Sequence, residues 1–262
     1  MSVVTLDGEI IHYEVLGRGR PLIYLHSWIG SWRYWVPAMQ ATSIGYRSYA
    51  LDLWGFGDTA KRPSMYALDF QVKLINDFME YMGIGKIALV GHGLGAAVAM
   101  KFAANYPGVV DRLLLSSLPS DAAVINPRLR TAGLPELVDW ILGRQPGADS
   151  ARTEAAKADL LAIQASLSNL EEANLNQIFT ALATPCLFVY GQNDPAVQIP
   201  PEETFDGMPE HTHYIIFEQS GHFPMLEETN KFNRLLGDFL ALASGESPRQ
   251  LQLKEEWKRR IR

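Results

Sequence analysis

The sequence predicts an α/β fold in which a mostly parallel sheet is covered by helices on both faces. Apolar, β-branched runs typical of buried strands alternate with helical patterns along the chain. The predicted strands of this sheet cover residues 22–26, 48–53, 86–90, 111–117, 184–190 and 213–218. With 262 residues, of which 47% are hydrophobic, the chain can bury a substantial core as one domain.

The N-terminal part predicts a hairpin. Residues 2–6 and 9–16 have strand patterns, and Asp7-Gly8 between them is a strong signal for a two-residue turn. Because this region alternates and carries charges, it indicates neither a signal peptide nor a membrane span. We therefore expect a cytoplasmic protein. Helical patterns follow at residues 66–82 and 96–104.

The middle of the chain departs from this alternation. Residues 119–180 have helical patterns, including 134–144 and 151–167, in place of strands. The predicted units are a core of residues 1–118 and 181–244, an inserted helical segment of residues 119–180, and a tail helix of residues 245–262. The tail is expected to be amphipathic, either solvated or docked; contact with an anionic membrane or a partner is the alternative.

Composition limits the classes of function. The 23 basic and 29 acidic residues give a net charge of −6, which argues against a nucleic-acid partner, because phosphate binding needs a basic face. The single cysteine, Cys186, lies in a predicted strand and is expected to be a small core residue. We expect a small-molecule substrate, no nucleic-acid or membrane partner, no cofactor or metal, and a monomer or homodimer.

The most informative stretch covers residues 86–107. A strand pattern meets the turn Gly91-His92-Gly93-Leu94-Gly95, which opens into a small-residue helix. This is the context of a nucleophile elbow, G-x-S-x-G, with Gly93 where the serine belongs. The same letters also fit a dinucleotide-binding fingerprint, which needs an acidic residue at the end of the next strand. That strand ends in Ser116-Ser117, so the nucleotide interpretation fails.

Five regions in order resemble the α/β-hydrolase superfamily. Residues 22–35 are similar to its oxyanion loop, 49–63 to a strand followed by a glycine-rich turn, and 86–107 to its elbow. Residues 184–197 and 220–240 are similar to the regions that carry the catalytic acid and histidine. The resemblance covers about residues 1–242 except the middle. It implies an esterase- or lactonase-like fold in which residues 119–180, inserted after the sixth strand, form a helical lid.

The resemblance also implies roles for individual residues. Asp194 is the expected acid, His222 the expected base, and Gly93 marks the nucleophile position. The backbone N–H groups of Trp28 and Leu94 would form the oxyanion hole, because any residue type there can donate.

Three further residues are expected to contact substrate. Ser27 stands where the family usually has glycine after His26, and its hydroxyl would either line the pocket or be a tolerated small group. Trp32 and Ser117 are the other expected substrate-binding residues.

Three explanations fit a glycine at position 93. A serine could have been replaced to trap a ligand, the chain could be a natural binding protein, or the Asp194–His222 dyad could act alone as a general base. Glycine keeps the strained elbow intact, and its missing side chain would leave a polar gap beside His222 large enough for a water molecule. Ser116 and Ser117 are weak alternative nucleophiles because their backbone is not an elbow. His92 is expected to be a packing residue.

Aromatic residues crowd the predicted loops. Trp28, Trp32, Tyr34, Trp35 and Trp54 would either line an apolar cavity or anchor the loops to the core. The first predicted function is therefore a hydrolase-type enzyme for a small, largely apolar ester, lactone or related carbonyl compound. The second is a catalytically silent protein that binds a small apolar ligand.

Overall fold

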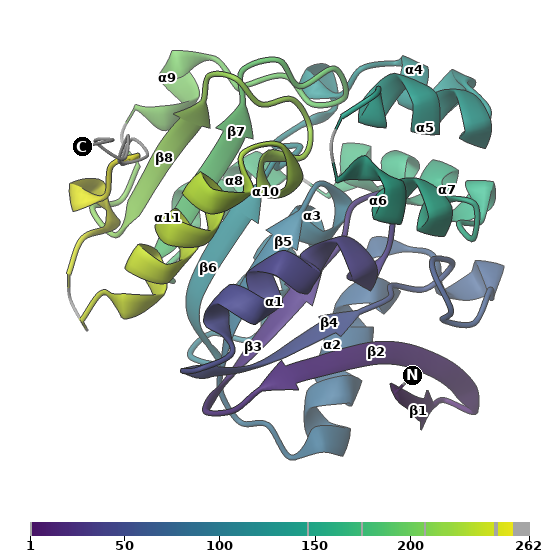
Figure 1. The fold of residues 1–262 in the computed structure, drawn as a ribbon, viewed down its shortest axis with the longest axis horizontal. Coiled ribbons are helices and arrows are strands. Elements are labelled where there is room, and N and C mark those ends of the chain that lie inside the picture. The colour runs from purple at the N-terminus through teal and green to yellow at the C-terminus, as the bar shows by residue number, and fades with distance from the viewer. Residues whose placement is uncertain (1, 146, 174, 207, 244–245, 254–262) are drawn as a thin grey trace, which may run out of the picture.

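An eight-stranded sheet forms the centre of the computed structural model, which describes residues 2–253 except 146, 174, 207, 244 and 245 (Figure 1). Its strands are β1 (Ser2–Leu6), β2 (Glu9–Gly17), β3 (Arg20–Leu25), β4 (Tyr46–Leu51), β5 (Ile87–His92), β6 (Val110–Ser116), β7 (Cys186–Gly191) and β8 (Thr212–Phe217). Their spatial order is β1-β2-β4-β3-β5-β6-β7-β8. Strands β3 to β8 run parallel, whereas β2 pairs antiparallel with both β1 and β4. The predicted α/β class is confirmed.

The hairpin at the N-terminus forms as the sequence predicts. Asp7 and Gly8 both have positive φ, 50° and 80°, and the register pairs Leu6 with Glu9 across them. Two consecutive residues with positive φ twist the connection in the sense that the strands require. The hairpin places β2 beside β4 and leaves β1 as the edge strand of the sheet.

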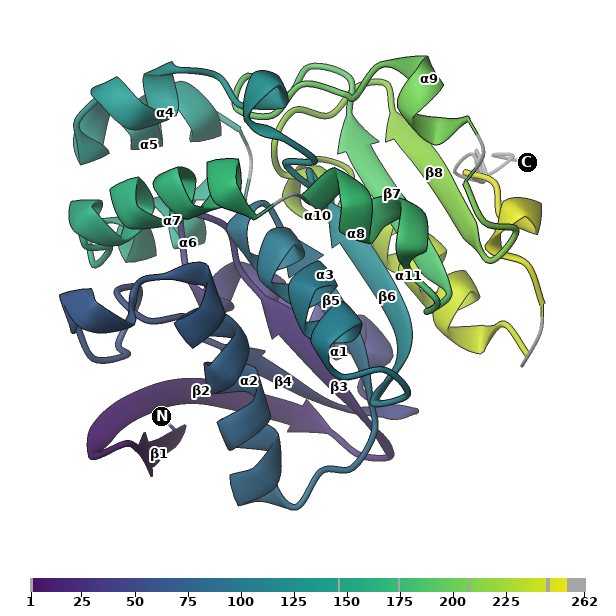
Figure 2. The same cartoon turned by 180° about the vertical axis from the view of Figure 1, so that it is seen from behind.

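Helices cover both faces of the sheet. Helices α1 (Val36–Thr42) and α11 (Thr229–Ala241) pack together on the face seen in Figure 1. Helices α2 (Leu68–Met82), α3 (Leu94–Asn105) and α8 (Leu175–Ala181) lie side by side on the other face, seen in Figure 2. Because both faces are covered, β5 and β7 are buried along their whole length, including Cys186, as predicted.

The inserted segment follows β6 and is helical. It contains α4 (Arg128–Thr131), α5 (Leu134–Leu142), α6 (Ala148–Ala155), α7 (Leu160–Glu172) and α8. Helix α6 packs against η1 (Trp32–Trp35), the turn after β3, so it lies on the side where the parallel strands end (Figure 1). Helix α8 instead packs beside α3. Helix α8 lies at the predicted boundary between lid and core, and it belongs to the layer of helices that covers the sheet.

The sequence pattern over residues 151–167 is divided between two helices rather than forming one. Helix α6 ends at Ala155, and Asp159 has an extended backbone and accepts a hydrogen bond from the Leu161 amide at 2.9 Å. An aspartate in this position caps a new helix and interrupts the preceding one.

The remaining short elements are η2 (Pro63–Met65), η3 (Ala122–Val124), α9 (Glu202–Phe205), α10 (Pro224–Glu227) and η4 (Pro248–Gln250). Arg249, in the predicted tail, donates hydrogen bonds to the Met208 and Thr212 carbonyls, so this part of the tail docks at the start of β8. The predicted tail helix lies largely outside the described residues. Over the described part of the chain, no helix combines the length and apolar character that crossing a bilayer requires.

Candidate active site

The turn between β5 and α3 has the geometry of a nucleophile elbow. Gly93 adopts φ 53° and ψ −113°, a combination that L side chains rarely adopt. Its flanking glycines are required by close backbone contacts: an ideal Cβ on Gly91 would lie 2.4 Å from the Gly95 carbonyl oxygen, and one on Gly95 would lie 2.4 Å from the Leu25 carbonyl oxygen. The elbow is therefore intact although its centre has no side chain.

Asp194 and His222 form a buried acid–base pair. They follow β7 and β8, and Asp194 Oδ2 lies 2.8 Å from His222 Nδ1. Because an ionised carboxylate can only accept, we assign the proton to Nδ1, which leaves Nε2 as an acceptor. The other carboxylate oxygen accepts from the Ala196 and Val197 amides at 2.8 and 3.0 Å.

Asp194 stays ionised in this pair. Burial alone would raise the pKa of its carboxyl group, but the charge and hydrogen bond of His222, together with hydrogen bonds from Val197 and Ser117, outweigh burial and lower the pKa. An ionised Asp194 fixes the imidazole tautomer and stabilises a protonated His222.

Ser27 occupies the space beside His222. Its Oγ lies 3.1 Å from His222 Nε2, and both residues are fully buried. An ideal Cβ on Gly93 would lie 2.1 Å from Ser27 Oγ and 2.9 Å from Ser27 Cβ. The predicted water-sized gap beside His222 is wrong, because the Ser27 hydroxyl fills it.

The backbone of Ser27 is held on both sides. Its amide donates to Tyr34 Oη at 2.8 Å, and its carbonyl oxygen lies 2.7 Å from His26 Nδ1. The Leu53 amide donates to His26 Nε2 at 3.0 Å, so Nδ1 carries the proton and donates to Ser27. Burial lowers the pKa of His26, which agrees with a neutral ring.

His92 joins this arrangement to His222. Its Nδ1 lies 2.9 Å from Tyr34 Oη, and its Nε2 lies 2.7 Å from the His222 carbonyl oxygen. Tyr34 accepts from Ser27, so its own proton goes to His92, which then donates to His222. Burial and the neighbouring His222 hold the pKa of His92 well below its usual value, so the ring is neutral. His92, expected to be a packing residue, thus also holds the backbone of His222.

Glu227 holds the His222 loop from the other side. Its carboxylate accepts hydrogen bonds from the amides of Gly221 and Phe223, the residues on either side of His222. The sequence pattern did not predict this role of Glu227. A carboxylate five residues after the histidine of a Gly-His pair is the signal that could have indicated it.

Two backbone amides remain available near this centre. Among the described residues, no acceptor takes a hydrogen bond from the amides of Trp28 or Leu94, although both residues are fully buried. Leu94 opens the twelve-residue helix α3, whose N-terminus carries partial positive charge. Buried donors without partners are rare and costly. The oxyanion hole formed by these two amides stays a prediction.

The aromatic residues of this region are largely core residues. Trp28, Tyr34, Trp35 and Trp54 are at most 1% exposed. The Trp28 ring lies nearly parallel to His222, at 19° and 6.3 Å between centroids, and its Nε1 donates to Ser166 Oγ of α7 at 3.0 Å. Loop anchoring therefore accounts for most of them, and Trp28 also forms one wall of the site.

Of the two other residues expected to bind substrate, Ser117 lies next to His222, whereas Trp32 lies next to Asp52. Ser117 has φ 48°, and its hydroxyl faces the carbonyl oxygen of His222 at 3.5 Å, behind the base. Trp32 donates its amide to Asp52 at 2.9 Å, and its ring lies beside His12 and Arg33. Their contact with a substrate stays a prediction.

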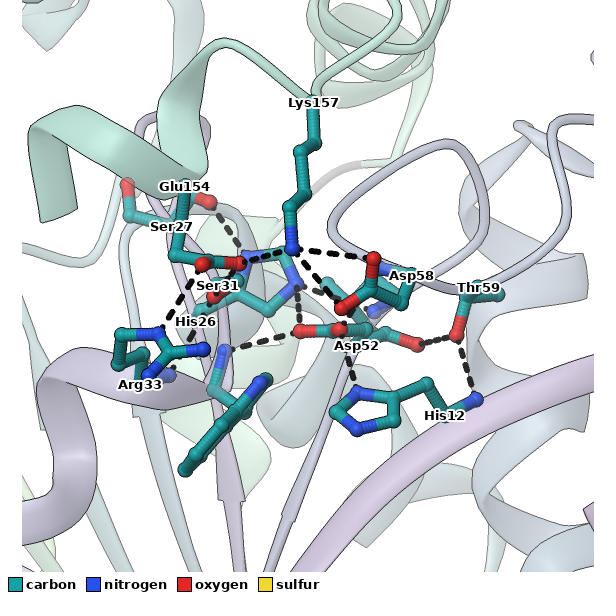
Figure 3. Close-up of polar contacts among 12 residues, drawn as sticks. His12, His26, Ser27, Ser31, Arg33, Asp52, Asp58, Thr59, Glu154 and Lys157 are labelled. Carbon is teal, nitrogen blue, oxygen red and sulfur yellow. Dashed lines mark hydrogen bonds and ion pairs between the residues drawn. The ribbon is translucent and has the colours of Figure 1, made fainter. Parts of the chain in front are cut away.

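A polar cluster fastens the inserted segment above the site (Figure 3). Glu154 of α6 is almost fully buried and accepts from Ser31 Oγ at 3.2 Å and Arg33 Nε at 3.0 Å. Lys157 bridges Glu154 and Asp58 at 3.0 and 2.9 Å. The turn after β3, the one after β4 and α6 are thereby tied together.

Below this cluster lies a buried aspartate. Asp52 accepts from the amides of Trp32 and Asp58, and its Oδ2 lies 2.8 Å from His12 Nδ1. His12, Asp52 and Asp58 offer ligand atoms within 4.8 Å of one another, which is metal-like spacing. However, Asp58 already pairs with Lys157, and both carboxylate oxygens of Asp52 already have hydrogen-bond partners. These contacts give the cluster a structural role.

The fold and the buried acid–base pair at the ends of β7 and β8 are those of a hydrolytic enzyme class, and the chain belongs to the alpha/beta hydrolase family. That family's profile matches residues 22–235. A similar protein is the pimeloyl-[acyl-carrier protein] methyl ester esterase of Vibrio campbellii, 24% identical over 255 residues that cover 88% of this chain and 98% of the esterase. Another is the 2-hydroxy-6-oxo-6-(2'-aminophenyl)hexa-2,4-dienoic acid hydrolase of Metapseudomonas resinovorans, 24% identical over 91% of this chain and 90% of that enzyme.

Solved structures show the same fold. The enol-lactonase from Burkholderia xenovorans LB400 superposes with a TM-score of 0.80, 18% identity, and coverage of 92% of this chain and 100% of that one. An esterase from Exiguobacterium antarcticum has a TM-score of 0.80, 19% identity, and coverage of 91% and 98%. The similar proteins named here are hydrolytic enzymes.

Proposed function

We propose that this protein hydrolyses a small, largely apolar ester or lactone, with His222 as the general base. The observation that carries the proposal is the buried Asp194–His222 pair, whose Nε2 lies 3.1 Å from the Ser27 hydroxyl, together with the amides of Trp28 and Leu94, which have no acceptor among the described residues. The similar proteins named as a methyl ester esterase and an enol-lactonase support this substrate class.

Each part of this arrangement matches one need of acyl transfer. His222 Nε2 accepts the proton of the attacking group and later returns a proton to the leaving oxygen. Asp194 stabilises the imidazolium that exists between these steps. The amides of Trp28 and Leu94 would stabilise the negative charge on the carbonyl oxygen, and removing one such donor from an enzyme costs about 10²–10³-fold in kcat.

The surroundings favour an apolar substrate. Trp28 and Phe223 are buried, and their rings lie beside His222 with centroids 6.3 and 5.2 Å away. In such a water-poor site, electrostatic interactions are stronger than in bulk water. Since Ser27 and His222 are fully buried, substrate entry requires the inserted segment to move.

The alternative, a silent binding protein, is favoured only by the absence of a side chain at Gly93. It predicts that a ligand binds but that no turnover depends on His222. The two functions therefore differ in whether turnover depends on His222.

The first test measures turnover of p-nitrophenyl acetate and butyrate and of a small aromatic lactone. We expect His222→Ala and Asp194→Asn to lower kcat by about 10²–10⁴-fold, the usual contribution of general acid–base groups. His213→Gln, a histidine on β8 outside the site, serves as the matched control and should keep wild-type turnover. Turnover of these compounds that is insensitive to both site variants would contradict the proposed function.

A further inference from the structure

We propose that Ser27 is the nucleophile of this protein, displaced from the elbow to the turn after β3. The inference rests on the proposed function and assigns it the attacking group. Gly93, at the usual position, has no side chain, whereas Ser27 Oγ lies 3.1 Å from His222 Nε2. That distance is within the range expected between a nucleophile and its base.

The space of the missing side chain is the space that Ser27 fills. A Cβ on Gly93 would lie only 2.1 Å from Ser27 Oγ, so the Ser27 hydroxyl enters the same site from a different strand. The two departures from the family pattern are thus reciprocal: serine stands where glycine is usual, and glycine stands where serine is usual. With Ser27 in place, the elbow has no room for a side chain.

The hydroxyl of Ser27 has the required hydrogen-bond direction. His222 Nδ1 donates to Asp194, so Nε2 is an acceptor and Ser27 Oγ–H is the donor. The backbone is held by Tyr34 at the amide and by His26 at the carbonyl oxygen. A nucleophile fixed in this way approaches the acyl carbon with little reorganisation.

The oxyanion donors keep their places when the nucleophile moves. Trp28 is the residue after Ser27 in the chain, as Leu94 is the residue after Gly93 at the elbow. Leu94, at the start of α3, supplies the second amide. The Ser27 amide itself is committed to Tyr34 and does not compete.

The reaction balances with water as the only co-reactant. Ser27 Oγ attacks the acyl carbon while its proton passes to His222 Nε2, and the bond to the leaving oxygen breaks as that oxygen takes the proton. A water molecule then gives one proton to His222 and attacks the acyl group on Ser27. When the Ser27–acyl bond breaks, His222 returns the proton to Oγ, and the carboxylic acid leaves.

The other serines of the region do not face the base in this way. Ser117 Oγ faces the backbone carbonyl of His222, and Ser116 Oγ is buried without a hydrogen-bond partner among the described residues. Neither serine has a hydrogen bond to the His222 ring within the described structure. Ser116 therefore offers a matched control.

The test combines a fluorophosphonate label with ester turnover. We expect intact-mass analysis to show one adduct, located on Ser27 by fragmentation, and Ser27→Ala to abolish it and lower kcat by about 10⁴-fold or more. Ser116→Ala should label like the wild type. Circular dichroism checks that each variant is folded.

Two results would overturn the inference, and they differ in what they say about the proposed function. If turnover depends on His222 but Ser27→Ala retains it, the base activates water directly, and only the nucleophile is wrong. If the wild type neither labels nor turns over any ester, and His222→Ala changes nothing, the proposed function fails together with the nucleophile.

A double variant provides an independent check. Ser27→Gly combined with Gly93→Ser returns the hydroxyl to the elbow and removes the overlap. We expect Ser27→Gly alone to be inactive and unlabelled, and the double variant to label at position 93 and recover turnover. A double variant that labels while the wild type does not would show an intact site without a natural nucleophile, which overturns the inference.

Discussion

At Gly93 two separate penalties oppose a side chain. The backbone conformation, φ 53° and ψ −113°, costs a non-glycine residue about 1–3 kcal/mol. In addition, a Cβ there would lie 2.1 Å from Ser27 Oγ and 3.3 Å from Trp28 Cζ3. Only the contact with Ser27 disappears when Ser27 loses its side chain, so the two penalties can be measured separately.

A stability cycle tests this separation. We expect Gly93→Ala to lower the free energy of unfolding by more than the conformational 1–3 kcal/mol, because the added methyl overlaps Ser27. In a Ser27→Gly background, the same change should cost only about 1–3 kcal/mol. Urea denaturation of the four proteins gives the coupling free energy, expected to exceed about 1 kcal/mol. Strict additivity would mean that position 93 and Ser27 do not share space.

At the scale of elements, four parallel strands bring the site together. Ser27 follows β3, Gly93 follows β5, Asp194 follows β7 and His222 follows β8. Because parallel strands end at one edge of the sheet, these four loops meet there. The chain of hydrogen bonds from Ser27 through Tyr34 and His92 to His222 then fixes the β3 and β8 loops relative to each other.

Several polar contacts attach the inserted segment to this edge, and Glu154 makes contacts with Ser31, Arg33 and Lys157. We expect Glu154→Gln to weaken its contacts with Arg33 and Lys157, because hydrogen bonds to charged groups contribute about 1.5–3 kcal/mol. Local opening of α6 should therefore become about tenfold more frequent, measured by hydrogen–deuterium exchange of its amides. Faster labelling by a bulky fluorophosphonate should accompany it.

A control for this variant lies on α5. Asp139 pairs with Arg152 at an exposed position, where an ion pair contributes little. Asp139→Asn should leave both the exchange and the labelling rate close to wild type. Equal effects of the two variants would indicate a general loosening of the segment and would contradict a specific role of Glu154.

At the scale of the whole molecule, the sequence predicts the strands and the first turn well, but it does not predict which side chain lies beside His222. Strand alternation and the Asp7-Gly8 turn depend on local patterns, and both appear in the fold. The position of Ser27 against His222, 195 residues away, depends on the packing of β3 against β5 and on the space left by Gly93. Local sequence patterns do not encode the 3.1 Å distance between Ser27 Oγ and His222 Nε2. The only local indication is that serine at position 27 and glycine at position 93 both differ from the usual family pattern.

The break between α6 and α7 shows the same limit. The helical pattern over residues 151–167 is continuous by composition, but Asp159 caps a new helix and accepts from Tyr66 Oη at 2.7 Å. Asp159 could either continue the first helix or cap a second one, and its hydrogen bond with Tyr66, a residue distant in sequence, favours the cap. Element types are therefore easier to predict than their ends.

Three buried histidines make the stability of the whole molecule depend on pH around 6.5. Burial is the main cause that lowers the pKa of His26 and His92 below the ordinary 6.5, so unfolding at lower pH takes up protons that the folded state does not bind. Their contribution to stability is present above pH 6.5 and is lost as the pH falls below it. His12 has a raised pKa: burial opposes protonation, but Asp52 outweighs it, so its contribution is lost only as the pH rises above 6.5.

We therefore expect the free energy of unfolding to fall between pH 6 and pH 5 by up to about 2.7 kcal/mol, since each proton taken up contributes about 1.36 kcal/mol per pH unit. His92→Gln should lower that slope by up to one proton, whatever it does to the stability itself, and His12→Gln should leave it unchanged because His12 titrates in another window. Urea denaturation at quarter-unit steps of pH measures both slopes. A wild-type stability that stays flat or rises as the pH falls from 6 to 5 would show that His26 and His92 are not held neutral. A protonated His92 would donate from Nδ1 to Tyr34 Oη, which reverses that hydrogen bond, and would still donate from Nε2 to the His222 carbonyl oxygen.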